Sequence, residues 1–337
     1  MANGFGSFYI GNSGLQSAQN ALNTTANNLA NVDTKGYVRE QVRFADKNYI
    51  MNVQPTAHTN MQQSGLGVSI GDVMHARDIF LDKAFRQESG RGAFYENCYE
   101  TATYVEDLFQ ELAGQEFKTS ISDLWRAFQE YAKDPSNSTN QNLILQKSEL
   151  LLSRTTNLYQ DLQSYQSNIN EQIEEDVNRV NEIGRRIYEI NLAIQKVESS
   201  GVETAMTLRD ERDLLLDELS TYGKIEVKED ATGFAFVDME NVPFIDESCC
   251  HELGLKKENG TGFYTPYWVH LSNVSAGEYH EAFPIDTEIS TELNNDIGSI
   301  KSKLKMRGTT YGRFDDMTPE NYAKIEDCVV METQAEI

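Results

Sequence analysis

Few side chains in this sequence of 337 residues have the types and spacing that chemistry requires. The best candidate for a metal site is Cys249-Cys250-His251, because thiolate and imidazole groups are ligands that zinc prefers. Three consecutive residues rarely point toward one ion, and this spacing matches none of the usual zinc motifs. We therefore expect no bound metal and no cofactor. The four cysteines also provide no disulfide framework for a chain of this length.

A catalytic constellation is not evident either. The five histidines, at positions 58, 75, 251, 270 and 280, are scattered along the chain. The sequence contains no HExxH, GxSxG, Walker or dinucleotide-binding motif. A cluster of acidic residues within one predicted helix is typical of a solvated helix face rather than of a catalytic carboxylate pair; it comprises Glu171, Glu174, Glu175 and Asp176. We therefore expect a protein that is not an enzyme.

Composition excludes two classes of partner. The formal net charge is −24 and the pI is about 4.6, which argues against binding to nucleic acid or to an anionic membrane. No run of about 18 apolar residues exists, so the sequence predicts no membrane-spanning segment. The N-terminal stretch MANGFGSFYIGN lacks the basic region and the apolar core of a cleaved secretory signal.

The elements that must position any functional residue are mainly helical. Apolar stripes at helical spacing predict helices over residues 77–112, 120–134, 138–199, 203–222 and 287–306, and a last helix from residue 318. The helix over 138–199 would be roughly 90 Å long. Its heptad pattern contains a four-residue insertion between Tyr165 and Val177, which locally unwinds a supercoil. We interpret the charged run Arg209-Asp210-Glu211-Arg212-Asp213 as outward-facing and intrahelical pairs.

Residues 38–76 and 223–285 show strand-like alternation, with turns predicted at Gly233 and at Asn259-Gly260. The predicted fold class is therefore mainly α, with long helices forming an elongated coiled-coil-like bundle and a small inserted β-rich domain. We divide the chain into four parts. These are an N-terminal axial helix with an extended mobile segment (1–76), a helical bundle domain (77–222), the β-rich domain (223–285) and truncated return helices of the helical domain (286–337).

The stretch Ser13–Tyr37 has the most distinctive periodicity. Its apolar positions alternate in steps of three and four, a period of 3.5 that is typical of a left-handed coiled-coil seam; they are Leu15, Ala18, Leu22, Thr25, Leu29 and Val32. Periodicity alone does not separate this interpretation from one amphipathic helix of a globular bundle. A helix with so narrow an apolar stripe cannot be stable alone, so it needs a partner helix.

Several motifs resemble a known protein family. The N-terminal ones are similar to the signature of bacterial flagellar axial proteins, which include rod, hook and hook-associated proteins; they are Ser13-Gly14-Leu15, Ala21-Leu22-Asn23, Asn27-Asn28-Leu29-Ala30-Asn31 and Thr34-Lys35-Gly36-Tyr37. Later motifs resemble the flagellar hook-associated protein 1 (FlgK) family in particular; they are Arg77-Asp78, Phe80-Leu81-Asp82, Arg86, Thr207-Leu208-Arg209-Asp210, Arg212-Asp213, the run from Leu215 to Ser220, Asp296-Ile297-Gly298-Ser299-Ile300 and Arg307.

This resemblance implies a structural adaptor at the junction between hook and filament of the bacterial flagellum. The implied partners are the hook protein, a second hook-associated (junction) protein, further copies of the chain in a ring, and the type III flagellar export apparatus. The implied location is the extracellular flagellum, reached without a cleaved signal peptide. The expected subunit-interface residues are Leu15, Ala18, Leu22, Asn27, Asn28, Leu29, Asn31, Gly36 and Tyr37.

One departure from the family bears on these expectations. Family members carry a C-terminal helix that pairs with the N-terminal one, and this sequence supplies no such helix. The seam is therefore expected to be unpaired, and the chain is either a fragment, which we favour, or a naturally short form. The alternative function is a cytosolic coiled-coil scaffold or binding module, which the long helix alone would permit.

Overall fold

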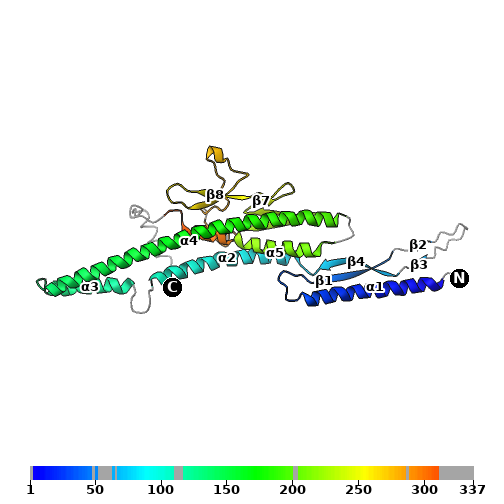
Figure 1. Cartoon of the computed structure of the whole chain (residues 1–337), viewed down its shortest axis with the longest axis horizontal. Helices are drawn as coiled ribbons and strands as arrows, with labels where there is room; N and C mark the ends of the chain where they lie inside the picture. Colours follow the sequence, from blue (N-terminus) through cyan, green and yellow to red (C-terminus); the bar gives the residue numbers. More distant parts are fainter. Residues whose placement is uncertain are drawn as a thin grey trace. The chain divides into compact units, whose positions relative to one another are not determined.

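The computed structural model describes residues 3–47, 50–51, 63–64, 67–109, 117–199, 204–285 and 288–310 (Figure 1). Within them the chain is mainly helical, with small antiparallel sheets, as the sequence predicts. The helices are α1 (Asn3–Ala30), α2 (Ile79–Phe109), α3 (Phe117–Lys133), α4 (Ser138–Glu198), α5 (Met206–Tyr222) and α6 (Ser299–Arg307), with one 3₁₀ turn at Val274–Ala276. None of the described helices is long and apolar enough to cross a membrane.

The strands pair in four small antiparallel sheets. Their bounds are β1 (Glu40–Asp46), β2 (Ile50–Met51), β3 (Gln63–Ser64), β4 (Val68–His75), β5 (Ile225–Glu229), β6 (Ala235–Met239), β7 (Val242–Ile245), β8 (Leu253–Lys257) and β9 (Tyr264–Trp268). Strand β1 pairs with β4, β2 with β3, β8 with β9, and β6 lies between β5 and β7. The turns predicted at Gly233 and Gly260 are confirmed, because both glycines have positive φ values and connect β5 to β6 and β8 to β9.

The chain forms two compact units, and α2 and α4 contribute residues to both. The first unit comprises Met1–Ser89 and Glu182–His251, and the second comprises Gly90–Asn181 and Glu252–Ile337. These units follow spatial contacts, whereas the four parts proposed above follow the order of predicted elements, and that four-part division stays a prediction.

The predicted stripe of α4 supplies much of the buried apolar surface. Eight β-branched side chains in its C-terminal half are almost fully buried; they are Ile169, Ile173, Val177, Val180, Ile183, Ile187, Ile190 and Ile194. The stripe passes through the predicted four-residue insertion without a break in the helix, which runs for 61 residues. By contrast Leu145 and Leu152, in the N-terminal half of the helix, are mostly exposed.

Three buried asparagines connect α4 to the sheets. Asn181 donates a 2.9 Å bond to the Leu253 carbonyl and accepts a 2.8 Å bond from the Leu253 amide, at the start of β8. Asn191 bonds the carbonyl and the amide of Ala235 in β6 at 2.9 and 3.3 Å. Asn170 accepts the amide of Tyr264 in β9 at 2.8 Å. Because the first two asparagines offer a donor and an acceptor, each satisfies both backbone groups of its strand residue.

The predicted helix over 287–306 is wrong in its first half, since α6 begins only at Ser299. Side-chain bonds to the backbone hold the preceding residues in turns: Asn295 accepts the Ser290 amide and donates to the Glu288 carbonyl. Such local bonds compete with helical ones. The predicted last helix, from Thr318, lies outside the described residues.

The interpretation of residues 209–213 as outward-facing and intrahelical pairs is wrong. Asp210 and Arg212 are buried, and the partners given for all five side chains lie on other elements. Arg212 is only 2% exposed, and it donates to the Gly233 carbonyl at 2.7 Å and to Glu229 at 2.6 Å. Asp213 lies 3.1 Å from Arg77, which precedes α2. The helical period cannot reveal these partners, because they come from other elements.

Candidate functional site

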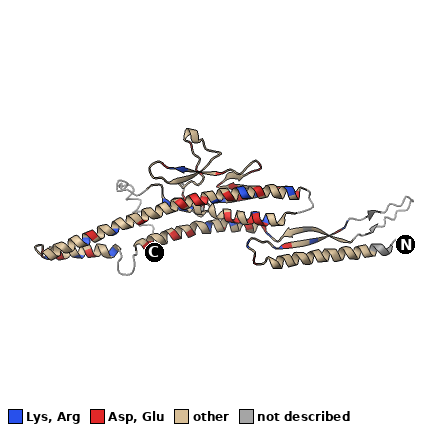
Figure 2. Ribbon diagram, in the orientation of Figure 1, with Lys and Arg blue, Asp and Glu red and all other residues tan. Residues whose placement is uncertain are grey.

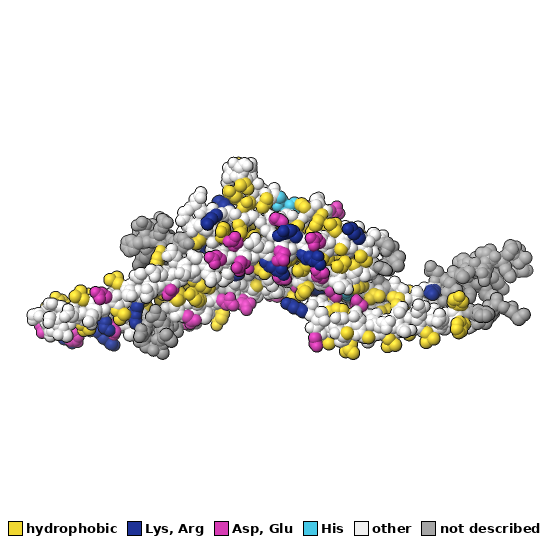
Figure 3. All heavy atoms as spheres, viewed as in Figure 1, with side chains coloured by type: hydrophobic (Ala, Val, Ile, Leu, Met, Phe, Trp, Pro, Cys, Tyr) yellow, Lys and Arg dark blue, Asp and Glu magenta, His cyan; other side chains and the backbone are white. Residues whose placement is uncertain are grey.

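Helix α1 carries no charged side chain over its 28 residues, whereas α5 and much of α4 are densely charged (Figure 2). Its apolar seam faces solvent. Leu15 and Leu29 are each 74% exposed and Leu22 is 68% exposed, and Val32, just past the helix end, is 72% exposed. Hydrophobic side chains gather along this edge of α1 (Figure 3). An exposed apolar row on an uncharged helix is typical of an interaction face, and the interface role of this seam stays a prediction.

The seam is longer than the sequence analysis recognised. Helix α1 begins at Asn3, so Phe8 lies seven residues before Leu15 on the same face, and it is 74% exposed. Phe8, Leu15, Leu22 and Leu29 thus occupy one heptad position through four repeats. The seven-residue step back from Leu15 was the signal that could have identified Phe8.

The opposite face of α1 packs on the β1–β4 ribbon through small polar residues. Ser13 and Ser17 are buried, and they bond the amide and the carbonyl of Val68 at 3.3 and 3.2 Å. Gly67 next to them has a φ of +95°, and a Cβ there would lie 2.0 Å from the Ser13 hydroxyl. The helix therefore uses its polar side for folding and keeps its apolar side free, the reverse of an ordinary surface helix.

The predicted interface asparagines find partners within the chain. Asn28 accepts bonds from the Glu40 amide at 2.9 Å and from the Tyr37 hydroxyl at 2.8 Å, and it donates to the Glu40 carbonyl at 2.9 Å. Asn31 donates to the Asn27 side chain at 2.9 Å. These bonds fasten the end of α1 to β1. A contact of the same asparagines with another subunit stays a prediction.

The segment after α1 also anchors on α5. Gly36 has a φ of +84°, and a Cβ there would lie within 3.3 Å of three Leu214 atoms. The Val38 amide donates to Asp210 at 3.3 Å. Burial and the negative charges of Glu40 and Asp210 raise the pKa of Tyr37, so its hydroxyl remains a hydrogen-bond donor. Gly36 and Tyr37 thus support the position of the seam, although they do not belong to it.

A charged cluster holds the start of α2 on the same helix. Arg86 donates to Asp217 at 2.7 Å, and Arg77 lies 2.6 Å from Asp82 and 3.1 Å from Asp213. Burial lowers the pKa of Arg77, but the effects of Asp213, Asp82 and Asp217 exceed it and raise the pKa overall. The motif residues around 77–86 and 210–217, far apart in the sequence, therefore form one contact.

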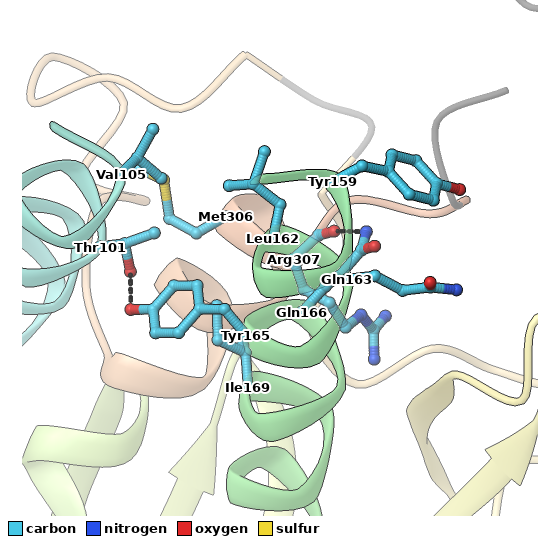
Figure 4. Close-up of a pocket in the computed structure, with 10 residues that line it drawn as sticks. All are labelled: Thr101, Val105, Tyr159, Leu162, Gln163, Tyr165, Gln166, Ile169, Met306 and Arg307. Carbon is cyan, nitrogen blue, oxygen red and sulfur yellow. Dashed lines mark hydrogen bonds between the residues drawn. The ribbon is translucent and has the colours of Figure 1, made fainter. Parts of the chain in front are cut away.

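The second unit contains a mainly apolar pocket of about 300 Å³ between α2, α4 and α6 (Figure 4). Two of its polar side chains are bonded within the chain: the Tyr165 hydroxyl donates to Thr101 at 3.3 Å, and Gln166 donates to the Arg307 carbonyl at 2.5 Å. The Arg307 guanidinium bonds the Asn170 side chain and the Tyr264 carbonyl. This pocket offers no nucleophile paired with a base among the residues that line it.

Comparisons with known proteins agree with this architecture. The sequence profile of the flagellar hook-associated protein FlgK helical domain matches residues 102–316, and that of the flagella basal body rod protein matches residues 8–37. Flagellar hook-associated protein 1 of Bacillus subtilis is 28% identical over 332 residues, which are 93% of this chain and 62% of that protein. The Escherichia coli protein of the same name is 26% identical over 234 residues, 68% of this chain and 41% of that protein.

A solved structure shares the fold. The flagellar hook junction protein FlgK from Burkholderia pseudomallei superimposes with a TM-score of 0.50 at 18% identity, covering 68% of this chain and 38% of that one. The chain thus spans 62% or less of the length of these relatives. Since the helical-domain profile matches more than half of the sequence, the chain belongs to the FlgK family of flagellar hook-associated proteins.

Proposed function

We propose that this chain is part of a structural adaptor at the junction between the flagellar hook and filament. The single observation that carries the proposal is the exposed heptad seam of the uncharged helix α1. Coiled-coil association would cover the seam when the chain assembles with neighbouring axial subunits. The names of the matched relatives support this role, since they are hook-associated or hook junction proteins.

The finer partner assignments belong to the same proposal. Each copy contacts further copies in a ring, the hook protein on one side and a second hook-associated protein on the other. Repeated heterologous contacts of this kind suit a subunit that shows an unpaired seam. The type III flagellar export apparatus delivers the chain to the extracellular flagellum. The role is structural rather than catalytic, as in the family.

Burial of the seam would favour association. Burying a leucine side chain is worth about 1.5–3 kcal/mol, so Leu15, Leu22 and Leu29 together could contribute roughly 5–9 kcal/mol before the entropy of association is deducted. A carboxylate at the central position would remove one leucine and would bury an unpaired charge, so association should fail.

The test is the substitution Leu22→Asp, introduced into the native gene in a motile strain. Asn20→Asp is the matched control, because Asn20 is exposed on the same helix but does not belong to the seam. We expect both purified variants to keep the helical circular dichroism of the wild type, because neither side chain is buried. The Leu22 variant should be absent from isolated hook–filament structures and its cells should not swim, whereas the control should assemble.

Normal incorporation of the Leu22→Asp variant would refute the proposal. Retention of the wild-type protein in the cytoplasm of flagellated cells would also refute it, and would favour the cytosolic scaffold instead.

A further inference from the structure

The loop after β7 brings together three side chains that can bind a metal ion. The ligand atoms of Asp246, Cys249 and His251 all lie within 4.8 Å of one another. The Cys249 sulfur is 3.8 Å from Nδ1 of His251, and Nε2 of the same ring is 2.9 Å from the Asp246 carboxylate. These two contacts use different nitrogens of the His251 ring, and one ion can bind only one of them. Tetrahedral zinc bonds of about 2.0–2.3 Å place neighbouring ligand atoms about 3.2–3.8 Å apart, so the side chains must turn until a single ring nitrogen faces both the carboxylate and the thiolate.

Bonds of the loop backbone hold the Asp246 carboxylate and keep the three residues close together before any ion binds. The Asp246 carboxylate accepts the amides of Ser248 and Cys249 at 2.7 and 3.0 Å, and the Asp246 amide donates to the Cys249 carbonyl at 3.1 Å. The His251 amide donates to the Phe244 carbonyl at 2.8 Å, which closes the loop. These amide bonds and the contact with His251 lower the pKa of Asp246, so the carboxylate remains ionised.

The group of candidate metal ligands in the structure differs by one residue from the Cys249-Cys250-His251 group considered in the sequence analysis. Cys250 forms a β-bridge with Ile245, and its sulfur would lie 2.7 Å from a Cβ placed on Gly184 of α4. It therefore packs against the helix and is half-buried, whereas Cys249 is exposed. The objection that three consecutive residues cannot point toward one ion no longer applies, because Asp246 takes the place of Cys250.

We propose that Asp246, Cys249 and His251 form a binding site for a divalent cation of the zinc class, with water as the fourth ligand. The donor set of one thiolate sulfur, one imidazole nitrogen and one carboxylate oxygen favours a borderline ion such as Zn²⁺ over Mg²⁺ or Ca²⁺, which prefer oxygen alone. Binding deprotonates the Cys249 thiol and releases that proton to the buffer, and the metal–sulfur bond replaces the S–H bond. The bound ion would cross-link Asp246, Cys249 and His251 within the loop between β7 and β8.

The test uses the full chain without a histidine tag, kept reduced, and titrated with Co²⁺ as a spectroscopic substitute for zinc. We expect a thiolate-to-cobalt charge-transfer absorption that saturates at one ion per chain and disappears when Zn²⁺ is added. The band should be absent from Cys249→Ser. Asp246→Asn and His251→Ala should each weaken Co²⁺ binding by about tenfold or more.

Cys250→Ala is the matched control, since it removes the adjacent thiol, which faces α4. Its titration should equal that of the wild type. The proposal is overturned if the wild type shows no charge-transfer band, if Cys249→Ser keeps the band, or if the band depends on Cys250 instead. Circular dichroism of each variant establishes that loss of binding does not reflect loss of folding.

Discussion

Replacing Asn181 by leucine tests how far the second unit depends on bonds between α4 and the strands. Asn181 is 8% exposed and makes both of its described amide bonds to Leu253, which is 4% exposed. Leucine has a similar volume but neither donor nor acceptor. The substitution would thus remove the side-chain partner of both the amide and the carbonyl of a buried strand residue.

The size of the destabilisation follows from the two backbone groups that lose their partner. Each unsatisfied buried backbone group costs about 1–3 kcal/mol, so two groups cost about 2–6 kcal/mol. The apolar surface of the new side chain recovers about 1–2 kcal/mol of this. We therefore expect Asn181→Leu to lower the free energy of unfolding by about 1–4 kcal/mol, a range that reaches the upper end of what single substitutions usually do.

Tryptophan fluorescence provides a local assay. Trp268 is fully buried and pairs directly with Leu253 in the β8–β9 register, whereas Trp125 is 65% exposed. In a Trp125→Phe background, urea unfolding monitored by Trp268 reports on the strand pair that Asn181 holds. The control is Asn178→Leu, at an exposed position one turn earlier on α4, which should change stability by less than about 0.5 kcal/mol. Equal midpoints for the two variants would refute the reasoning.

Two further substitutions test the first unit. Gly36→Val should lower the free energy of unfolding by about 1–3 kcal/mol in calorimetry, because φ at this position is +84° and Leu214 fills the space; an unchanged melting temperature would count against the anchoring role. Glu198→Gln should cost about 1–2 kcal/mol at pH 7, because two charge-assisted bonds of 2.8 Å from Arg209 weaken. The bond from Arg209 opposes the effect of burial and lowers the pKa of Glu198, so its contribution is present above the unfolded-state pKa of about 4.3 and is lost as the pH falls through the folded value. The difference between wild type and variant in urea titrations should therefore shrink below about pH 4, and a constant difference would exclude this linkage.

The features that the sequence predicts best are those that depend on the hydrophobic periodicity of a single helix. The bounds of α4 were predicted to within one residue, since an uninterrupted apolar stripe and a preceding Asp-Pro stop define them. The seam of α1 was predicted for the same reason. Neither prediction required knowledge of a distant partner, because hydrophobic periodicity is a local signal.

Polar residues that act across elements could not be assigned in this way. Asn170, Asn181 and Asn191 look like ordinary polar positions of a helix, and only the strands they meet give them a role. The error over Arg212 has the same origin, because its partners Glu229 and Gly233 belong to a hairpin that the helical period does not encode.

Contacts between distant elements also explain why the sequence motifs after residue 76 affect a seam that ends at Val32. An exposed apolar row directs assembly only if its helix keeps a fixed direction, since a loosely tethered helix would lose the entropy of ordering each time it bound. Here α5 supplies the fixed support: Leu214 packs on Gly36, Asp210 accepts the Val38 amide, and Asp217 holds Arg86. If the seam is the interaction face that we propose, the charged motif residues serve it indirectly, because they hold the segment that follows α1.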